Sequence, residues 1–341
     1  MYRRITLSYR VGIIGAGGIA NCHARAVQEL SETELVAICD ISKTALNNFG
    51  KTFDVPSQTT NLRDMLHGNE IDILIVCTWG NSHAPITVEA AQTGSLKAIL
   101  CEKPISASFV ECQKMIESAK HNNVLLAEAF KFRHHPCHLR VKHLIDTGAI
   151  GKIALIRSTF TAAVDPDLLR PDYNWRFNQE KRGGAIFDLG CYCIHHARFI
   201  ADSEPSKIQA QGFYGLKSKV PESVVLQMEF PNEISAQCAF SFRYYGSEEF
   251  EVYGSHGYLR MEKAWNNEDQ PVVLEIIDNN GKEQIIKFPP IFQFTEQLKH
   301  LCECLNEGIP HRIPLHDSLN NMKVIDAVYS SLNSGESTVL A

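Results

Sequence analysis

The sequence lacks any apolar run long enough to cross a membrane, and it lacks a long basic run. A transmembrane helix needs about 20 consecutive apolar residues, and no stretch of the 341 residues approaches that length. The formal net charge is −6, whereas nucleic-acid-binding proteins usually carry a basic patch or stripe. We therefore expect neither a membrane nor a nucleic acid as a partner.

The usual spacings of paired cysteines are also missing, although cysteine itself is abundant. The chain has 11 cysteines, an odd number, and no CxxC pair. Four of them lie in apolar, strand-like runs: Cys39, Cys77, Cys101 and Cys238. Cysteines in such apolar runs are typically buried and reduced, so we expect a reducing, cytoplasmic compartment. The pair Arg3-Arg4 resembles an export signal, but Arg10 begins the first predicted strand and leaves no room for its apolar segment.

The first 130 residues alternate between two periodicities. Short apolar runs rich in β-branched residues predict strands buried on both faces, at Arg10–Gly15, Leu35–Cys39, Ile71–Cys77, Ala98–Cys101 and Val124–Ala127. Amphipathic helical stretches separate them, for example Ala84–Gln92 and Phe109–Lys120. Alternating strands and helices imply a doubly wound, parallel sheet, and hence an α/β fold.

The pattern changes after about Phe130. A helix is expected over His138–Asp146 and a strand over Lys152–Ala162, and two further helices near Phe292–Asn306 and His316–Leu332. Between them, apolar residues recur at every second position, as in Val224, Leu226, Met228 and Phe230, and again in Ile234, Ala236, Cys238, Phe240 and Phe242. This alternation predicts an antiparallel sheet with one buried face. We expect two domains, at residues 1–128 and 129–341.

A glycine-rich turn follows the first predicted strand. Residues 15–20 read Gly-Ala-Gly-Gly-Ile-Ala and fit the GxGxxA pattern. In that pattern the first glycine permits a tight turn, the second lets a pyrophosphate approach the backbone, and the alanine allows close packing of helix on strand. Asp40 ends the next strand, where a carboxylate binds the ribose 2′-hydroxyl and repels a 2′-phosphate. The sequence predicts dinucleotide binding, with NAD favoured and NADP possible because Lys43 lies nearby.

Glu102-Lys103-Pro104 follows the predicted strand Ala98–Cys101, at the sheet edge where ligands bind. With the glycine turn, this tripeptide resembles the Gfo/Idh/MocA oxidoreductase family. The resemblance spans nearly the whole chain and includes Ala127-Glu128-Ala129-Phe130, Arg133, His135-Pro136, Leu144–Gly151, Asn174-Trp175-Arg176 and the segment from Gly183 to Tyr192. Tyr192 matches the branch that resembles glucose–fructose oxidoreductase, dihydrodiol dehydrogenase and xylose dehydrogenase.

The resemblance implies a fold, an activity and a set of site residues. The fold is a Rossmann domain followed by an α/β domain with a large, open, mostly antiparallel sheet. The activity is NAD(P)-dependent hydride transfer at a hydroxyl or carbonyl of a sugar, inositol or related polyol. Lys103, Asp188 and Tyr192 are the implied catalytic residues, and Arg133, Trp175 and Arg176 are weaker substrate-pocket candidates. The implied cofactor contacts are Gly15, Ala16, Gly17, Gly18, Ile19, Asp40, Thr78, Asn81, His83, Glu102 and Lys103.

Other interpretations remain open at this point. Some relatives cycle a tightly held NAD during glycoside cleavage or epimerisation, and others are non-catalytic NAD-binding regulators. The cluster His134, His135, Cys137 and His138 offers good zinc ligands, but its spacing fits no standard metal site, so we expect no metal. Thr78 is followed by Trp79 where the family often has proline.

The second predicted sheet has an outward face that is small and weakly charged. We place Gln227, Glu229, Ser235, Gln237, Ala239 and Ser241 on it. Members of the family commonly pair through this sheet. We therefore expect a homodimer or homotetramer.

Overall fold

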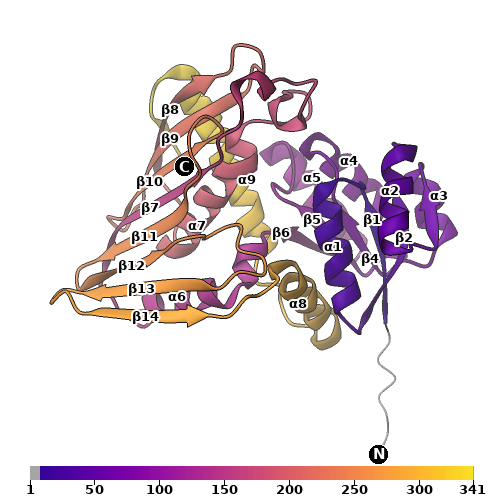
Figure 1. Cartoon of the computed structure of the whole chain (residues 1–341), viewed down its shortest axis with the longest axis horizontal. Helices are drawn as coiled ribbons and strands as arrows, with labels where there is room; N and C mark the ends of the chain where they lie inside the picture. Colours follow the sequence, from indigo (N-terminus) through magenta and orange to yellow (C-terminus); the bar gives the residue numbers. More distant parts are fainter. Residues whose placement is uncertain (1–7, 341) are drawn as a thin grey trace, which may run out of the picture. The chain divides into compact units, whose positions relative to one another are not determined.

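The computed structural model describes residues 8–340 (Figure 1). By its internal contacts the chain divides into two compact units. The first comprises the residues up to Lys131 together with Gln293–Ser318, and the second comprises Phe132–Phe292 together with the residues from Leu319 onward. The domain division expected near residue 128 stays a proposal. Arg3 and Arg4 lie outside the described residues.

A parallel six-stranded sheet forms the centre of the first unit. Its strands are β1 (Tyr9–Ile14), β2 (Thr33–Cys39), β3 (Ser57–Thr59), β4 (Ile73–Val76), β5 (Ala98–Glu102) and β6 (Leu125–Ala129). They lie in the order β3-β2-β1-β4-β5-β6, and all pairs are parallel. This is the doubly wound order in which ligands bind where the strand order reverses, between β1 and β4. The predicted parallel sheet is confirmed.

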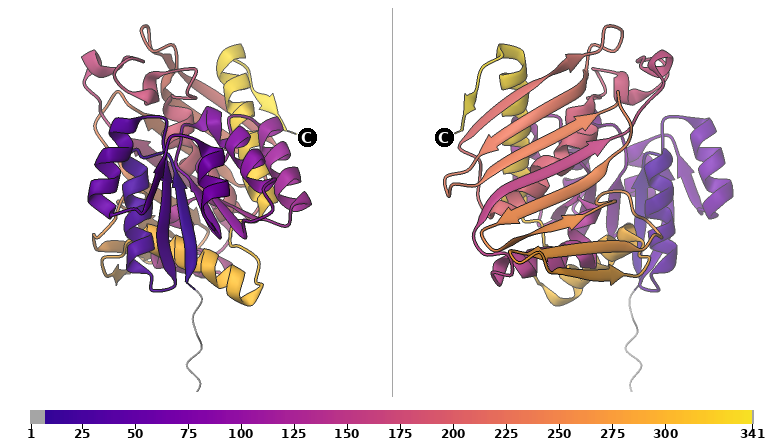
Figure 2. Two further views of the ribbon diagram at one scale, coloured as in Figure 1. Left: turned by 90° about the vertical axis from the view of Figure 1, so that its right-hand side faces the viewer. Right: turned by 60° about the vertical axis from the view of Figure 1, so that its left-hand side comes forward.

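Helices pack on both sides of this sheet (Figure 2, left). They are α1 (Gly18–Glu29), α2 (Lys43–Phe53), α3 (Leu62–Gly68), α4 (Gly80–Ala91), α5 (Phe109–His121) and α8 (Gln293–Glu307). Polar side chains cap three of them: Ser42 at α2, Asn61 at α3 and Ser108 at α5 accept hydrogen bonds from amides of the first turn. These caps begin the helices close to the carboxyl ends of the strands.

A mixed nine-stranded sheet forms the second unit. Its strands are β7 (Ile153–Thr161), β8 (Lys207–Tyr214), β9 (Pro221–Glu229), β10 (Ser235–Ser241), β11 (Glu248–Gly254), β12 (Gly257–Met261), β13 (Val272–Asp278), β14 (Glu283–Phe288) and β15 (Thr338–Val339). Their order is β14-β13-β12-β11-β7-β10-β9-β8-β15. Among the described strands of this second sheet, only the central pair β7–β10 is parallel. The expected large, mostly antiparallel sheet is confirmed.

Helices cover one face of the nine-stranded sheet. They include α6 (Pro136–Asp146), α7 (Cys191–Ala201) and α9 (Leu315–Ser334), the last of which begins in the first unit. The alternating apolar residues of β9 and β10 point to this covered face and are buried. No helix among residues 8–340 covers the other face (Figure 2, right). Ser241 was expected on that open face, but it is fully buried, because its hydroxyl bonds the Glu222 carbonyl where β10 ends.

No helix among residues 8–340 is long and apolar enough to cross a bilayer. All 11 cysteines fall in the described part of the chain. None of them forms a disulfide there, and ten are buried.

Candidate active site

The turn at residues 15–18 links β1 to α1 and has the geometry of a phosphate-binding turn. Gly15 has φ +94°, and a Cβ there would lie 2.6 Å from the Cys77 carbonyl oxygen, so only glycine fits. A Cβ on Gly17 or Gly18 would meet no atom within 4 Å. The backbone at these two positions is therefore open to a ligand, and the amides that begin α1 face the same end of the sheet. These residues fit a dinucleotide pyrophosphate.

Asp40 closes the same site from the end of β2. One carboxylate oxygen accepts a hydrogen bond of 2.7 Å from the Ala16 amide, and the other accepts one of 2.7 Å from the Ser42 amide. The carboxylate thus lies against the phosphate-binding turn, 24 residues away in sequence. A carboxylate keeps further lone pairs for a ribose hydroxyl when two are used. Its position fits the expected role at the ribose.

Three more of the expected cofactor contacts follow β4, one in the loop and two at the start of α4. Thr78 is half-buried and Asn81 is exposed in the first turn of α4. His83, one turn into α4, is buried instead: its Nδ1 lies 3.0 Å from the Pro104 carbonyl oxygen and its Nε2 lies 3.1 Å from that of Thr78. Burial lowers the pKa of His83, and the carbonyl contacts only partly oppose this effect. His83 thus joins the turn after β4 to the turn after β5.

The turn after β5 contains Lys103 and is held from inside the unit. Glu102 is buried, and its Oε1 lies 2.7 Å from Nε2 of His23, a fully buried residue of α1. Its Oε2 accepts a hydrogen bond of 3.2 Å from the Lys103 amide. Burial raises the pKa of Glu102, but the contacts with His23 and Lys103 outweigh it, so this pKa lies below its ordinary value. Glu102 is therefore an anion at neutral pH. Sequence reasoning missed His23.

The second unit holds the other expected site residues near a pair of glycines. A Cβ on Gly183 would lie 2.4 Å from the Arg176 carbonyl oxygen, so glycine lets these two backbone segments touch. Gly184 donates its amide to that same oxygen at 2.7 Å. The close approach brings Arg176 to Asp188, and Arg176 Nε lies 2.6 Å from Asp188 Oδ2. Trp175 stacks on the guanidinium of Arg176, 4.9 Å from its ring centroid.

Asp188 lies in a short π-helical segment, η4 (Ile186–Gly190), directly before α7. Such single wide turns occur frequently at functional sites. Asp188 is 7% exposed and Tyr192, in the first turn of α7, is 4% exposed. Three aromatic rings surround the Tyr192 ring at centroid distances of 5.4 to 5.9 Å: Phe132, Phe160 and Trp265. The Tyr192 ring is therefore part of a buried aromatic cluster.

Arg133 was a candidate for the substrate pocket, and the structure gives it internal partners. It is 7% exposed, its Nη1 lies 2.8 Å from Nε2 of His195, and its guanidinium carbon lies 3.7 Å from the centroid of Phe199. Both partners belong to α7. Since arginine has donors only, His195 must present Nε2 as the acceptor when it is neutral. Arg133 therefore supports the helix that carries Tyr192.

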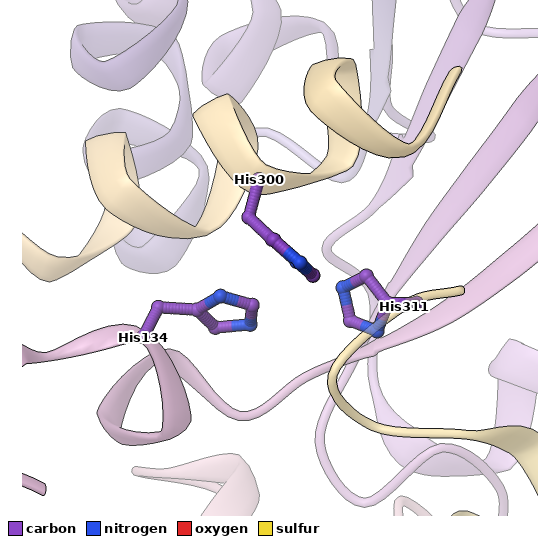
Figure 3. A group of neighbouring side chains, drawn as sticks. All are labelled: His134, His300 and His311. Atoms are coloured by element: carbon purple, nitrogen blue, oxygen red, sulfur yellow. The ribbon is translucent and has the colours of Figure 1, made fainter. Parts of the chain in front are cut away.

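The histidine-rich segment at residues 134–138 has structural contacts. His135 accepts a hydrogen bond from the Cys137 amide at the start of α6, and Nε2 of His138 lies 2.8 Å from the Ala264 carbonyl oxygen. Figure 3 shows His134 with two histidines of the first unit, His300 and His311, whose ring centroids lie 4.9 Å apart. His134 belongs to the second unit.

Comparison with known families decides what kind of protein carries this geometry. Residues 9–130 match the model of the oxidoreductase family with an NAD-binding Rossmann fold, and residues 138–260 match the GFO/IDH/MocA C-terminal domain. The chain belongs to the Gfo/Idh/MocA oxidoreductase family. The resemblance expected from the glycine turn and Glu102-Lys103-Pro104 is thereby confirmed. The expectation of an NAD(P)-binding oxidoreductase is confirmed with it.

Named relatives in the Gfo/Idh/MocA family cover most of the chain. The D-xylose 1-dehydrogenase [NADP(+)] of Haloarcula marismortui is 26% identical over 91% of this chain and 86% of its own length. The trans-1,2-dihydrobenzene-1,2-diol dehydrogenase of Mus musculus is 24% identical over 92% and 93%. The crystal structure of an aldose-aldose oxidoreductase from Caulobacter crescentus shares the fold, with a TM-score of 0.87, 23% identity and coverage of 98% of this chain and 100% of that one.

Proposed function

We propose that the chain transfers a hydride between NAD(P) and a secondary hydroxyl or carbonyl of a sugar, inositol or related polyol. One observation carries the proposal: Lys103 follows β5 at the same sheet edge as the open Gly17 turn and Asp40. This is the edge where doubly wound sheets bind ligands. The names of the two relatives specify a sugar and a diol as their substrates, which supports the polyol class.

Three side chains divide the proton chemistry in this proposal. A bound nicotinamide supplies the hydride acceptor or donor. A hydroxyl carbon releases hydride only as its oxygen loses a proton, so a base must lie within hydrogen-bond reach. Tyr192 is the proposed base, and Lys103 is the cation that lowers the tyrosine pKa from its ordinary value near 10. Asp188 orients the substrate.

The weaker candidates support these groups. Arg176 holds the Asp188 carboxylate through the 2.6 Å contact, and Trp175 holds Arg176 by stacking. Arg133 holds α7 through His195. We assign cofactor binding to residues 1–128 and substrate binding and self-association to residues 129–341.

The test is a panel of aldoses, inositols, diols and sugar nucleotides, followed by NADH and NADPH absorbance at neutral and alkaline pH. Sustained turnover of at least one polyol, abolished in Lys103→Met, is the expected result. NAD that copurifies and is never released during turnover would point instead to a cofactor-cycling enzyme. Cofactor binding with no turnover of any substrate would point to a regulator.

We further propose that the chain self-associates through the open face of the nine-stranded sheet and works in a reducing cytoplasm. The open face exposes apolar side chains on separate strands, among them Val225 (59% exposed) and Ile285 (50%). Val225, Gln227, Gln237 and Ala239 line a depression on it. Ten buried thiols without a disulfide in the described part of the chain agree with a reducing compartment.

A further inference from the structure

The turn that carries Lys103 is attached to the cofactor-binding helix by one buried pair of side chains. His23 lies on α1, five residues after Gly18, the first residue of that helix. Its ring is fully buried, and Nε2 lies 2.7 Å from Oε1 of Glu102 at the end of β5. His23 and Glu102 are 79 residues apart in sequence. This contact therefore links two separate parts of the site.

Nε2 of His23 and both oxygens of Glu102 have defined partners, whereas Nδ1 of His23 is buried without a hydrogen-bond partner among the described residues. Glu102 is an anion because its pKa is below the ordinary value, so its Oε1 accepts a hydrogen bond that Nε2–H of His23 donates. The second oxygen accepts the Lys103 amide at 3.2 Å. The ring of His23 is itself held edge-on by Phe294 of α8, at a centroid distance of 5.1 Å. The chain of contacts runs from α8 through His23 and Glu102 to the Lys103 backbone.

A buried carboxylate is costly unless it is fully hydrogen-bonded. Both oxygens of Glu102 accept a hydrogen bond inside the unit, and only 6% of the residue is exposed, so burial leaves an outside ligand little access to its remaining lone pairs. Ile105 is held separately, because its amide donates to Glu128 Oε1 at 2.9 Å. The turn between Glu102 and Ile105 is thus anchored at both ends, and Lys103 is the residue directly after the first anchor.

We propose that His23 and Glu102 are a positioning pair for Lys103, in place of the cofactor contact expected for Glu102. The pair fixes the backbone of Lys103 relative to the helix whose amino end binds the cofactor phosphates. This inference rests on the proposed function of Lys103 for its kinetic consequences. Misplacement by about 1 Å can lower turnover by about a hundredfold, so loss of the pair should lower kcat and leave cofactor affinity nearly unchanged.

Because His23 bonds Glu102 through Nε2 and not through Nδ1, substitutions at His23 can distinguish a directed hydrogen bond from general packing. A glutamine amide nitrogen reaches the place of histidine Nε2, whereas an asparagine amide nitrogen reaches that of Nδ1. His23→Gln should therefore keep kcat within about threefold of wild type, while His23→Asn and His23→Phe should lower it about tenfold or more. Val27→Ala is the matched control, because Val27 is also buried on α1, one turn further. It should lower the melting temperature and leave kcat unchanged.

A second variant and a second readout complete the test. Glu102→Met keeps a side chain of similar length but removes both acceptor oxygens, so it should lower kcat as His23→Phe does, even if the latter folds poorly. Hydrogen exchange of the NAD-bound protein should show faster exchange at the Lys103 amide in both variants, with β5 and the separately held Ile105 amide unchanged. This readout needs no substrate, so it stays informative if Lys103→Met retains turnover and the proposed function fails.

The proposal is overturned if His23→Phe and Glu102→Met show wild-type kcat and wild-type exchange at the Lys103 amide. It is equally overturned if His23→Gln is as impaired as His23→Phe, or if Val27→Ala lowers kcat as much as either, because the effect would then be one of general packing. Dissociation constants for NAD, measured by fluorescence titration, should stay within about threefold of wild type in all variants.

Discussion

Acid should destabilise the second unit through a histidine in its core, His196 on α7. The imidazole is fully buried, and neither of its nitrogens has a hydrogen-bond partner among the described residues. Its ring lies 4.2 Å from that of Phe250 and 5.4 Å from that of Trp265, measured between centroids. Burial, followed by the nearby His138, His195 and Arg133, lowers the pKa of His196 well below its ordinary value. The folded protein therefore keeps this ring neutral.

The direction of the pH effect follows from proton uptake on unfolding. A histidine in the unfolded chain titrates near pH 6.5, whereas His196 in the folded chain stays neutral far below that. The unfolded state thus binds the extra proton, so stability is complete above pH 6.5 and is lost as the pH falls. Between pH 7 and pH 5 this linkage amounts to about 1.9 kcal/mol of unfolding free energy. His138, with a pKa lowered to about 3 by burial, adds a similar loss.

The test is the variant His196→Leu, which removes one of these two titrating rings and fills nearly the same volume. The free energy of unfolding should fall by about 2 kcal/mol less than in wild type between pH 7 and pH 5. Urea denaturation followed by tryptophan fluorescence measures it, because Trp265 is fully buried beside His196 and reports on this core. His256→Gln, which changes an exposed histidine of the same unit, is the control and should keep the wild-type slope.

One result would refute this reasoning. If His196→Leu and wild type lose the same free energy of unfolding between pH 7 and pH 5, within about 0.5 kcal/mol, the imidazole is not kept neutral in the folded state. Carboxylates contribute to the pH dependence of both proteins and cancel in the comparison.

Three further predictions concern the cofactor, the chemistry and the assembly. Asp40→Ser removes the carboxylate beside the Ala16 amide, so the ratio of NADP to NAD affinity should rise about tenfold; a wild type that already prefers NADP would contradict this interpretation. Lys103→Met and Tyr192→Phe should each lower turnover about a hundredfold or more while NAD affinity and folding persist, and near-normal turnover of both on the true substrate would exclude the mechanism. Val225→Glu should shift sedimentation toward the monomer because it charges the open sheet face, and a wild type that is monomeric at micromolar concentration would rule out that interface.

Periodicity was sufficient to predict most of the fold. Strands buried on both faces, such as β1 and β4, appear as continuous apolar runs, and β9 and β10 show strict alternation. Periodicity missed β3, because Ser57–Thr59 is three polar residues held only by pairing with β2 at the sheet edge. It also put Ser241 on the open face, since alternation along a strand gives no information about how the strand ends.

Motifs indicated the candidate site, but they did not reveal which contacts hold its residues in place. The glycine turn, Asp40 and Lys103 are recognisable because their chemistry depends on short spacings within one strand–turn–helix unit. The contact of Arg133 with His195 joins residues 62 apart, and that of Arg176 with Asp188 joins residues 12 apart. Each depends on a tertiary approach, such as the one at Gly183, that no local pattern announces.

His23 shows why the tertiary contacts that motifs miss matter for function. It lies outside the GxGxxA pattern, and a lone histidine on a helix that packs against a sheet is more often a core residue than a functional one. Burial alone cannot distinguish these roles, since Val27 on the same helix is equally buried. The difference is a single directed hydrogen bond to Glu102, which links the phosphate-binding helix to the backbone of Lys103. In our proposal, the lysine that a motif identifies as catalytic depends on a residue with no motif, and substitutions at the two should impair the same step.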